Sequence, residues 1–164
     1  KFKLALHEDK TRLIEFGLFA ADRRRERGLG RPETFTFLGF THYWAKTRTG
    51  RSMVKWKTQG RRLAGKLKAV KLEVWHRMHE SIAEQHRYLT SVLRGHYRYY
   101  GVPGNYGPLR TFCNEVQRLW LRALRRRGGK KRLSWKVFNG YLQQLPLPQP
   151  SIVQSQSFFE VALG

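Results

Sequence analysis

The spacing of hydrophobic residues changes at about Arg61, and this change constrains the fold more than any other feature of the sequence. Before it, apolar and polar residues alternate at Phe2, Leu4 and Leu6, and residues 35–40, 41–46 and 53–57 are short strand candidates rich in aromatic and β-branched residues. After it, they recur every three or four residues, at Leu63, Leu67, Val70, Val74 and Met78. Alternation is typical of strands, whereas the longer period is typical of amphipathic helices. The sequence therefore predicts an α+β fold in which a small antiparallel sheet precedes a helical bundle.

The segments around the predicted strands are interpreted from their turn-forming residues. Residues 2–16 alternate on both sides of a polar break at residues 7–10, which predicts a hairpin. Residues 22–32 are charged, contain Gly and Pro and have no periodicity, so we expect a mobile loop there. Residues 47–51 are expected to form the turn between the last two strands.

Helical periodicity predicts four helices after the sheet. The first two cover residues 61–78 and 82–100, and the second ends at the Gly and Pro residues of 101–105. The third covers residues 108–127 and places its cations away from its apolar face, with Arg118, Arg122 and Arg125 opposite and Arg126 at the border. Ser134 is expected to cap a short fourth helix, after which three prolines favour an extended, loosely held tail. The predicted domains are residues 1–57, 58–144 and 145–164.

The charge of the chain indicates its partner. The sequence has 33 Lys and Arg against 11 Asp and Glu, a formal net charge of +22, while 40% of its residues are hydrophobic and can build a core. From Gln85 onwards, thirteen cations face only two acids, Glu115 and Glu160. Such an excess of one sign favours binding to a polyanion. No stretch reaches the ~20 apolar residues of a membrane span, so nucleic acid is preferred to a membrane surface.

The cysteine content and the start of the sequence indicate the cellular compartment. Cys113 is the only cysteine of the 164 residues, which excludes an internal disulfide and a zinc site built on several cysteines of this chain. No signal peptide opens the sequence. We therefore expect a reducing, cytoplasmic location, and the start at Lys1 suggests that an upstream part is missing.

Basic residues interleaved with aromatic ones are the strongest functional signal. Arginine and lysine neutralise phosphates, and aromatic rings can stack on unpaired bases, so this mixture is typical of RNA-binding surfaces. Helical spacing favours core packing for Tyr97 and Tyr100, whereas the arginines as a group favour RNA contact. The residues expected to bind RNA are Arg94, Arg98, Arg118, Arg122, Arg125, Arg126, Arg127, Lys130, Lys131 and Arg132.

No pattern predicts catalysis or a metal site. Glu8 and Asp9 are the only adjacent acids, but neighbouring residues of a strand point to opposite faces, so they are interpreted as turn residues. His76 and His79 lie three residues apart on a predicted helix without a convincing third ligand, and His96 needs help from elsewhere. We therefore expect no catalytic residue, no metal and no cofactor in this chain.

Three strings of residues resemble parts of bacterial group II intron reverse transcriptase/maturases. The string Leu-His-Glu-Asp-Lys-Thr-Arg at residues 6–12 and the later Phe37-Leu38-Gly39-Phe40 resemble the last palm motifs of those enzymes. The string Leu-Arg-Gly-His-Tyr-Arg-Tyr-Tyr-Gly-Val at residues 93–102 resembles their maturase-specific region. Because the strings follow the family's order and spacing, the chain resembles a C-terminal fragment comprising late palm, thumb and maturase-specific region.

The resemblance implies a role for each segment. Phe37, Leu38, Gly39 and Phe40 would form the primer grip, and Lys10 would lie near the incoming nucleotide. The sheet would be a remnant of the palm, and the helices would be the thumb and maturase region that bind intron RNA and assist its splicing. The family's catalytic carboxylates belong to a Tyr-Ala-Asp-Asp-type motif and an earlier strand, and this chain has neither. Mg²⁺ would then be expected only in the complete polymerase.

Three hypotheses remain open from the sequence. The first is a maturase-type RNA-binding module that binds structured group II intron RNA without a polymerase active site. The second is the C-terminal half of a split or truncated RNA-directed DNA polymerase, with an N-terminal reverse-transcriptase half and DNA primer or target strands as further partners. The third is a decayed remnant of a mobile element, against which the regular helical periodicity argues.

Overall fold

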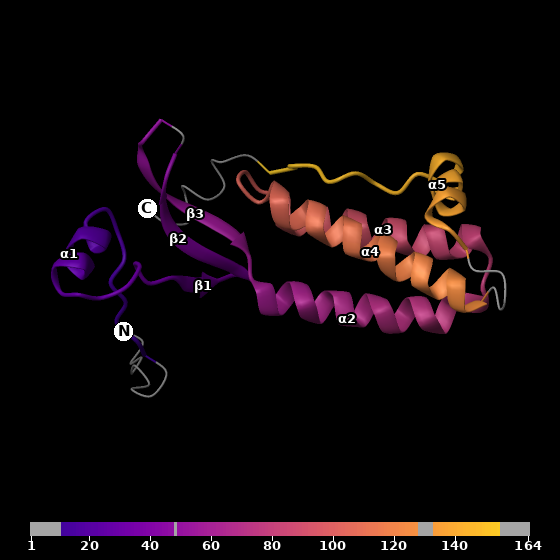
Figure 1. The fold of residues 1–164 in the computed structure, drawn as a ribbon, viewed down its shortest axis with the longest axis horizontal. Coiled ribbons are helices and arrows are strands. Elements are labelled where there is room, and N and C mark those ends of the chain that lie inside the picture. The colour runs from indigo at the N-terminus through magenta and orange to yellow at the C-terminus, as the bar shows by residue number, and fades with distance from the viewer. Residues whose placement is uncertain (1–10, 48, 128–132, 155–164) are drawn as a thin grey trace, which may run out of the picture. The chain divides into compact units, whose positions relative to one another are not determined.

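The computed structural model is an α+β structure with two compact units, residues 1–57 and 58–164 (Figure 1). It describes residues 11–47, 49–127 and 133–154. The first unit contains one short helix and a three-stranded antiparallel sheet, and helices follow in the second. The predicted fold class is therefore confirmed.

The sheet has the order β1 (Phe35–Phe37), β2 (Phe40–Lys46), β3 (Ser52–Thr58). Leu38 and Gly39 form the turn between β1 and β2, with φ of 47° and 79°, and the strands pair with Phe37 opposite Phe40. A two-residue hairpin turn of this kind needs positive φ at both central positions. The prediction of one strand over residues 35–40 is therefore wrong at its centre, whereas the strands at 41–46 and 53–57 are confirmed.

Two predictions for the first unit are wrong because ion pairs hold its chain in another form. Helix α1 (Ala20–Glu26) overlaps the first residues of the predicted loop, and Arg24 on this helix lies 3.9 Å from Glu15 and 4.0 Å from Glu33. Residues 11–16 form no strand, and the amide of Glu15 donates to a Glu33 carboxylate oxygen at 3.0 Å instead of to a strand partner. The first half of the predicted hairpin lies outside the described residues.

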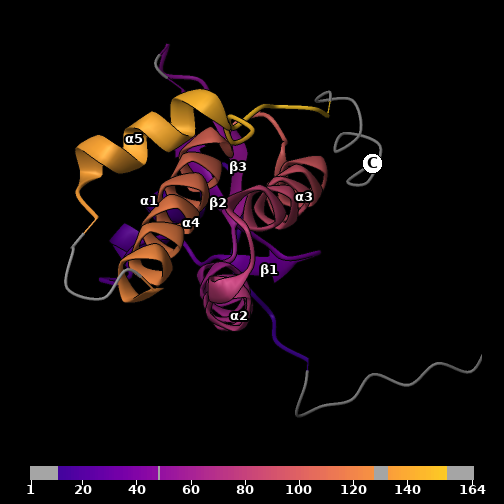
Figure 2. The same ribbon diagram turned by 90° about the vertical axis from the view of Figure 1, so that its right-hand side faces the viewer.

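The second unit is built from α2 (Gly60–His76), η2 (Arg77–His79), α3 (Ile82–Tyr100), α4 (Tyr106–Arg127) and α5 (Trp135–Gln144). Ser81 and Glu84 form a capping box at the start of α3, and Ser134 caps α5 as predicted. Figure 2 shows α2, α3 and α4 running side by side with α5 packed across the bundle. The four predicted helices are confirmed, with bounds shifted by a few residues.

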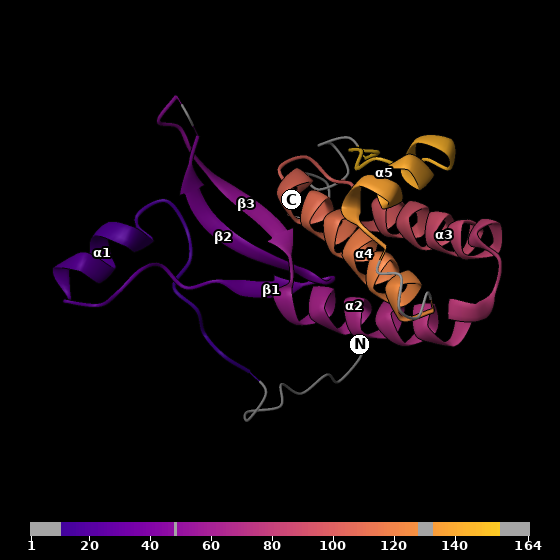
Figure 3. The same ribbon diagram turned by 45° about the vertical axis from the view of Figure 1, so that its right-hand side comes forward.

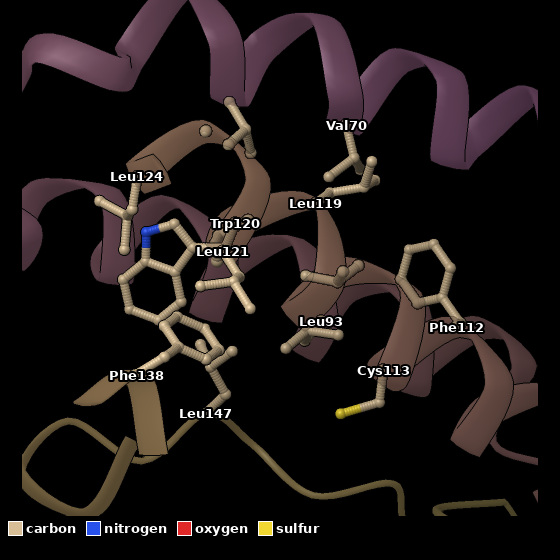
Figure 4. Close-up of a cluster of buried hydrophobic side chains, with 14 of the residues drawn as sticks. Val70, Leu93, Phe112, Cys113, Leu119, Trp120, Leu121, Leu124, Phe138 and Leu147 are labelled. Atoms are coloured by element: carbon tan, nitrogen blue, oxygen red, sulfur yellow. The ribbon is translucent and has the colours of Figure 1, made fainter. Parts of the chain in front are cut away.

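The core of the helical unit is centred on α4, which contributes nine buried residues. Figure 4 shows Trp120 among these side chains, in edge contact with Phe138 of α5 at 5.4 Å between ring centroids. The indole nitrogen of Trp120 donates to the buried Gln85 side chain of α3 at 2.8 Å. One residue therefore connects three helices through packing and a satisfied polar group.

Buried Asn105 connects the beginnings of α2 and α4. Its side chain accepts from the amide of Thr58 at 2.8 Å and donates to the Thr58 hydroxyl and to the Tyr100 carbonyl, each at 2.8 Å. At the other ends of these two helices, the guanidinium of Arg126 lies over the ring of Trp75. Since their starts meet and their ends meet, α2 and α4 run in the same direction.

Residues 145–154 have no helix or strand, but the prediction that they are loosely held is wrong. Leu147 is buried in the core, and the Pro148 carbonyl accepts from the Tyr97 hydroxyl at 3.1 Å. The amides of Val153 and Gln154 donate to the carbonyl of Gly101 at 2.8 and 3.0 Å. A side chain at position 101 would lie 2.8 Å from the carbonyl oxygen of Ser151, so only glycine permits this close approach.

Candidate nucleic-acid interface

The outer face of α3 carries a row of exposed arginines. Arg94 and Arg98 lie one turn apart, on the side of the helix opposite the buried Leu89 and Leu93. Arg87 lies two turns before Arg94 on the same side and is also exposed, although the sequence analysis missed it. The spacing of seven residues between Arg87 and Arg94 is two helical turns and indicates that they share a face. This spacing is less conspicuous in the sequence than the denser arginine cluster at the end of α4.

The outer face of α4 carries a second row of exposed arginines. Arg118 and Arg122 are exposed and lie opposite the buried Val116. Arg118 pairs with Glu115 at 2.5 Å, one turn before it. Because α3 and α4 both turn their apolar sides toward one core, their outer faces point in different directions. The arginines predicted to bind RNA therefore form two surfaces instead of one.

The last three arginines of α4 also contact the protein itself. Arg125 donates to the Leu133 carbonyl at 2.7 Å, and Arg127 donates to the Glu80 carbonyl at 2.8 Å. The guanidinium of Arg126 lies 5.3 Å from the centre of the Trp75 ring. These contacts fix where the charges lie, and they show that part of the cluster supports the bundle.

The remaining predicted residues lie elsewhere. Phe37 and Leu38 are 51% and 59% exposed at the tip of the β1–β2 hairpin, whereas Phe40 is buried. Lys10, Lys130, Lys131 and Arg132 lie outside the described residues. The four positions predicted to form a primer grip therefore lie at a hairpin turn, where the side chains of Phe37 and Leu38 are accessible.

Helix α2 supplies cations that the sequence analysis did not select. Lys68 and Lys71 lie three residues apart on the side that also carries Trp75, and the Lys71 ammonium is 4.6 Å from the centre of that ring. The ring of Trp75 thus contacts one cation from α2 and Arg126 from α4. The sequence feature that indicates a basic surface here is the absence of any acid in α2 before Glu73.

The described acids of the helical unit are all engaged in internal contacts. Residues 58–127 and 133–154 contain sixteen Lys and Arg but only four acids. Glu73 and Glu80 both bind Arg77, Glu84 serves the capping box, and Glu115 binds Arg118. The hydrogen bond from Ser81 also lowers the pKa of Glu84, which keeps this carboxylate ionised. Within the described part of the chain, Arg94, Arg98 and Arg122 have no carboxylate partner.

The aromatic residues of the maturase-like string divide into core and surface. Tyr97 is 3% exposed, and burial raises the pKa of its hydroxyl, which stays protonated and donates to Pro148. Tyr100 is half-buried and packs against the core, whereas Tyr99 is 51% exposed. The interpretation of Tyr97 and Tyr100 as packing residues is confirmed, and Tyr99 is the tyrosine of this string with an accessible ring.

The histidines form no metal site among the described residues, where no three His, Cys, Asp or Glu side chains come together. His76 and His79 are exposed, while His96 is buried and stacks on Phe112 at 3.8 Å between ring centroids. Burial, and then the nearby charge of Lys66, lower the pKa of His96 to about 4. The imidazole is therefore neutral at pH 7 and acts as a core residue.

Among the described residues, no helix is both long and apolar enough to cross a membrane. Comparisons with family models, with curated proteins and with solved structures found no match. The resemblance to group II intron maturases therefore stays a prediction.

Proposed function

We propose that the chain is an RNA-binding module of maturase type, which binds group II intron RNA and assists its splicing. The observation that carries this proposal is the balance of charge in the helical unit. Its four described acids are engaged by internal contacts, while exposed arginines on α3 and α4 have no carboxylate partner. Such cations gain most from a polyanion whose counterions they release. The family resemblance is what selects intron RNA among polyanions.

The proposal is tested by binding of the purified chain to a folded group II intron RNA and to a length-matched scrambled RNA. Each is measured at low and at near-physiological salt. If about eight phosphates are contacted, affinity falls with roughly the seventh power of salt concentration. We expect preference for the folded intron to persist at the higher salt. Equal and equally salt-sensitive binding to both RNAs would contradict a maturase role and leave a non-specific basic protein.

A second candidate is the C-terminal half of an RNA-directed DNA polymerase that works only with a fingers/palm partner. The accessible Phe37 and Leu38 at the hairpin tip favour it, because a primer grip must reach the end of a nucleic-acid strand. Mixing the chain with a separately purified fingers/palm half and Mg²⁺ tests this candidate. Primer extension that requires both parts, and that decreases when Leu38 is replaced by Asp, would support it.

A further inference from the structure

Two rows of cations border the line along which α2 and α4 pack. We name this surface the α2–α4 seam and define it by Trp75 and the cations Lys68, Lys71, Arg118, Arg122 and Arg126. The two helices make the most extensive helix–helix contact of the unit, and Figures 1, 2 and 3 show them side by side. The seam therefore combines charges from two elements held in a fixed relation.

The rows are ordered by the helices that carry them. Arg118, Arg122 and Arg126 follow at four-residue intervals, so the row extends over about 12 Å at the 1.5 Å rise of an α-helix. Lys68 and Lys71 lead along α2 to Trp75, where both rows meet. Packed helix axes lie about 8–10 Å apart, so the rows are separated by a distance on the order of 10 Å.

Trp75 lies at the end of the seam, where both of its neighbouring cations contact its ring. Its ring is contacted by Lys71 at 4.6 Å and by Arg126 at 5.3 Å. Proteins that bind single strands commonly offer an accessible aromatic face to a base. Here the ring positions two cations instead, which favours recognition of phosphates and not of bases.

We propose that the α2–α4 seam binds the two phosphate backbones of double-helical RNA. This inference rests on the proposed function and adds to it the surface and the form of RNA. A-form RNA has a deep, narrow major groove, which brings phosphates of opposite strands close together. Two rigid rows of cations match two such strands, whereas a single strand needs only one row. The major groove of B-form DNA is wider, about 12 Å, so the phosphates of its two strands lie farther apart across that groove.

The test compares three ligands of one sequence: an RNA duplex, its single strand and the corresponding DNA duplex. The double variant Lys68→Gln, Arg122→Gln removes one exposed charge from each row and leaves the packing on Trp75 unchanged. The control variant, Arg110→Gln with Lys136→Gln, removes two exposed charges from α4 and α5 away from the seam. Thermal melting followed by circular dichroism establishes that each variant is folded, and the two seam substitutions are also made singly.

We expect the full chain to bind the RNA duplex more tightly than the other two ligands. The seam variant should lose roughly tenfold to sixtyfold in affinity for the duplex at 0.1 M salt, and its salt slope should decrease by about two. Each single substitution should decrease the slope by about one, and the control variant should change affinity less than about threefold. Equal losses in the two double variants, or tighter binding to single strands or to DNA, would overturn the inference.

The outcomes separate this inference from the proposed function. Binding to folded intron RNA without preference for an RNA duplex would reject the seam and retain the maturase proposal. Failure to bind any of the RNAs would reject the proposed function, and the seam with it.

Discussion

The two units of this chain differ in how their stability arises. Among the described residues, the helical unit has seventeen buried hydrophobic residues, whereas the sheet unit has three, Ala20, Phe40 and Trp56. The sheet unit relies instead on ring contacts such as Phe16 with Phe35, and on arginines gathered around Glu15 and Glu33. Exposed ion pairs contribute little each, and burial of apolar area contributes most of the stability of small domains. In the part of the chain that the structure describes, the helical unit therefore has the core of a self-sufficient domain, and the sheet unit does not.

The largest expected effect is the difference in local stability itself. Hydrogen exchange should show that amides of β2 and β3 open more easily than those of α4, by a free energy on the order of 5 kcal/mol, comparable to the whole stability of a small domain. The measurement is native-state exchange followed by mass spectrometry or NMR. Protection of the strands equal to that of α4 would show that the two units unfold together.

Removing Trp120 should destabilise the helical unit by about 4 kcal/mol. Trp120→Ala leaves a large cavity in the core and removes the donor to the Gln85 side-chain oxygen, and truncations of this size cost roughly 3–5 kcal/mol. Chemical denaturation followed by circular dichroism measures the change. Trp135→Ala is the matched control, because that tryptophan is 44% exposed and its loss should cost less than about 1 kcal/mol.

Acidification should weaken the helical unit through His96. Its pKa is about 4 in the folded chain against 6.5 ordinarily, so between these values the unfolded chain binds a proton that the folded chain does not. The free energy of unfolding therefore rises with pH across this window and loses up to about 3 kcal/mol as pH falls from 6.5 to 4. Denaturation of the wild type and of His96→Phe at several pH values measures the slope. Identical slopes would assign the acid sensitivity to other groups.

A pair of glycine substitutions tests whether residues 145–154 belong to the folded unit. In Gly101→Ala the new methyl group would collide with the Tyr97 carbonyl oxygen and lie 2.9 Å from Val153, so we expect the free energy of unfolding to fall by about 1–3 kcal/mol. In Gly95→Ala nothing lies within 4 Å of the added group, and the helix should gain roughly 0.5–1 kcal/mol. Thermal melts compare the two. A neutral Gly101→Ala would mean that the tail is not held against α3.

The same comparison explains what the sequence could predict. Helices α2, α3 and α4 follow from periodicity because their burial is decided by residues three and four positions apart. Helix α1 could not be predicted from local periodicity, because its Arg24 is paired with Glu15 and Glu33, which lie nine residues before and after it in the sequence. The docking of the tail depends on Gly101 and on residues about fifty positions later, and no local pattern reports such a contact.

The candidate interface was predicted in part for a related reason. The density of arginines along the chain indicates Arg125, Arg126 and Arg127, which also contact the protein. It does not indicate Lys68 and Lys71, because their relevance comes from packing of α2 against α4 and not from their neighbours in sequence. Local composition therefore predicts which segments are basic, whereas tertiary packing decides which of their cations lie together on one surface.

The position of Leu147 in the core bears on how the chain folds as it is synthesised. Leu147 and Phe138 are both buried against α4, although they follow it in sequence. On a ribosome, α2, α3 and α4 emerge first, and their apolar faces stay incompletely covered until residues up to about 150 leave the exit tunnel. Nascent chains of this kind expose apolar surface that aggregates readily or recruits chaperones. Translation stopped just before Leu147 would thus yield a product that contains all the described helices but lacks the segment that closes the core.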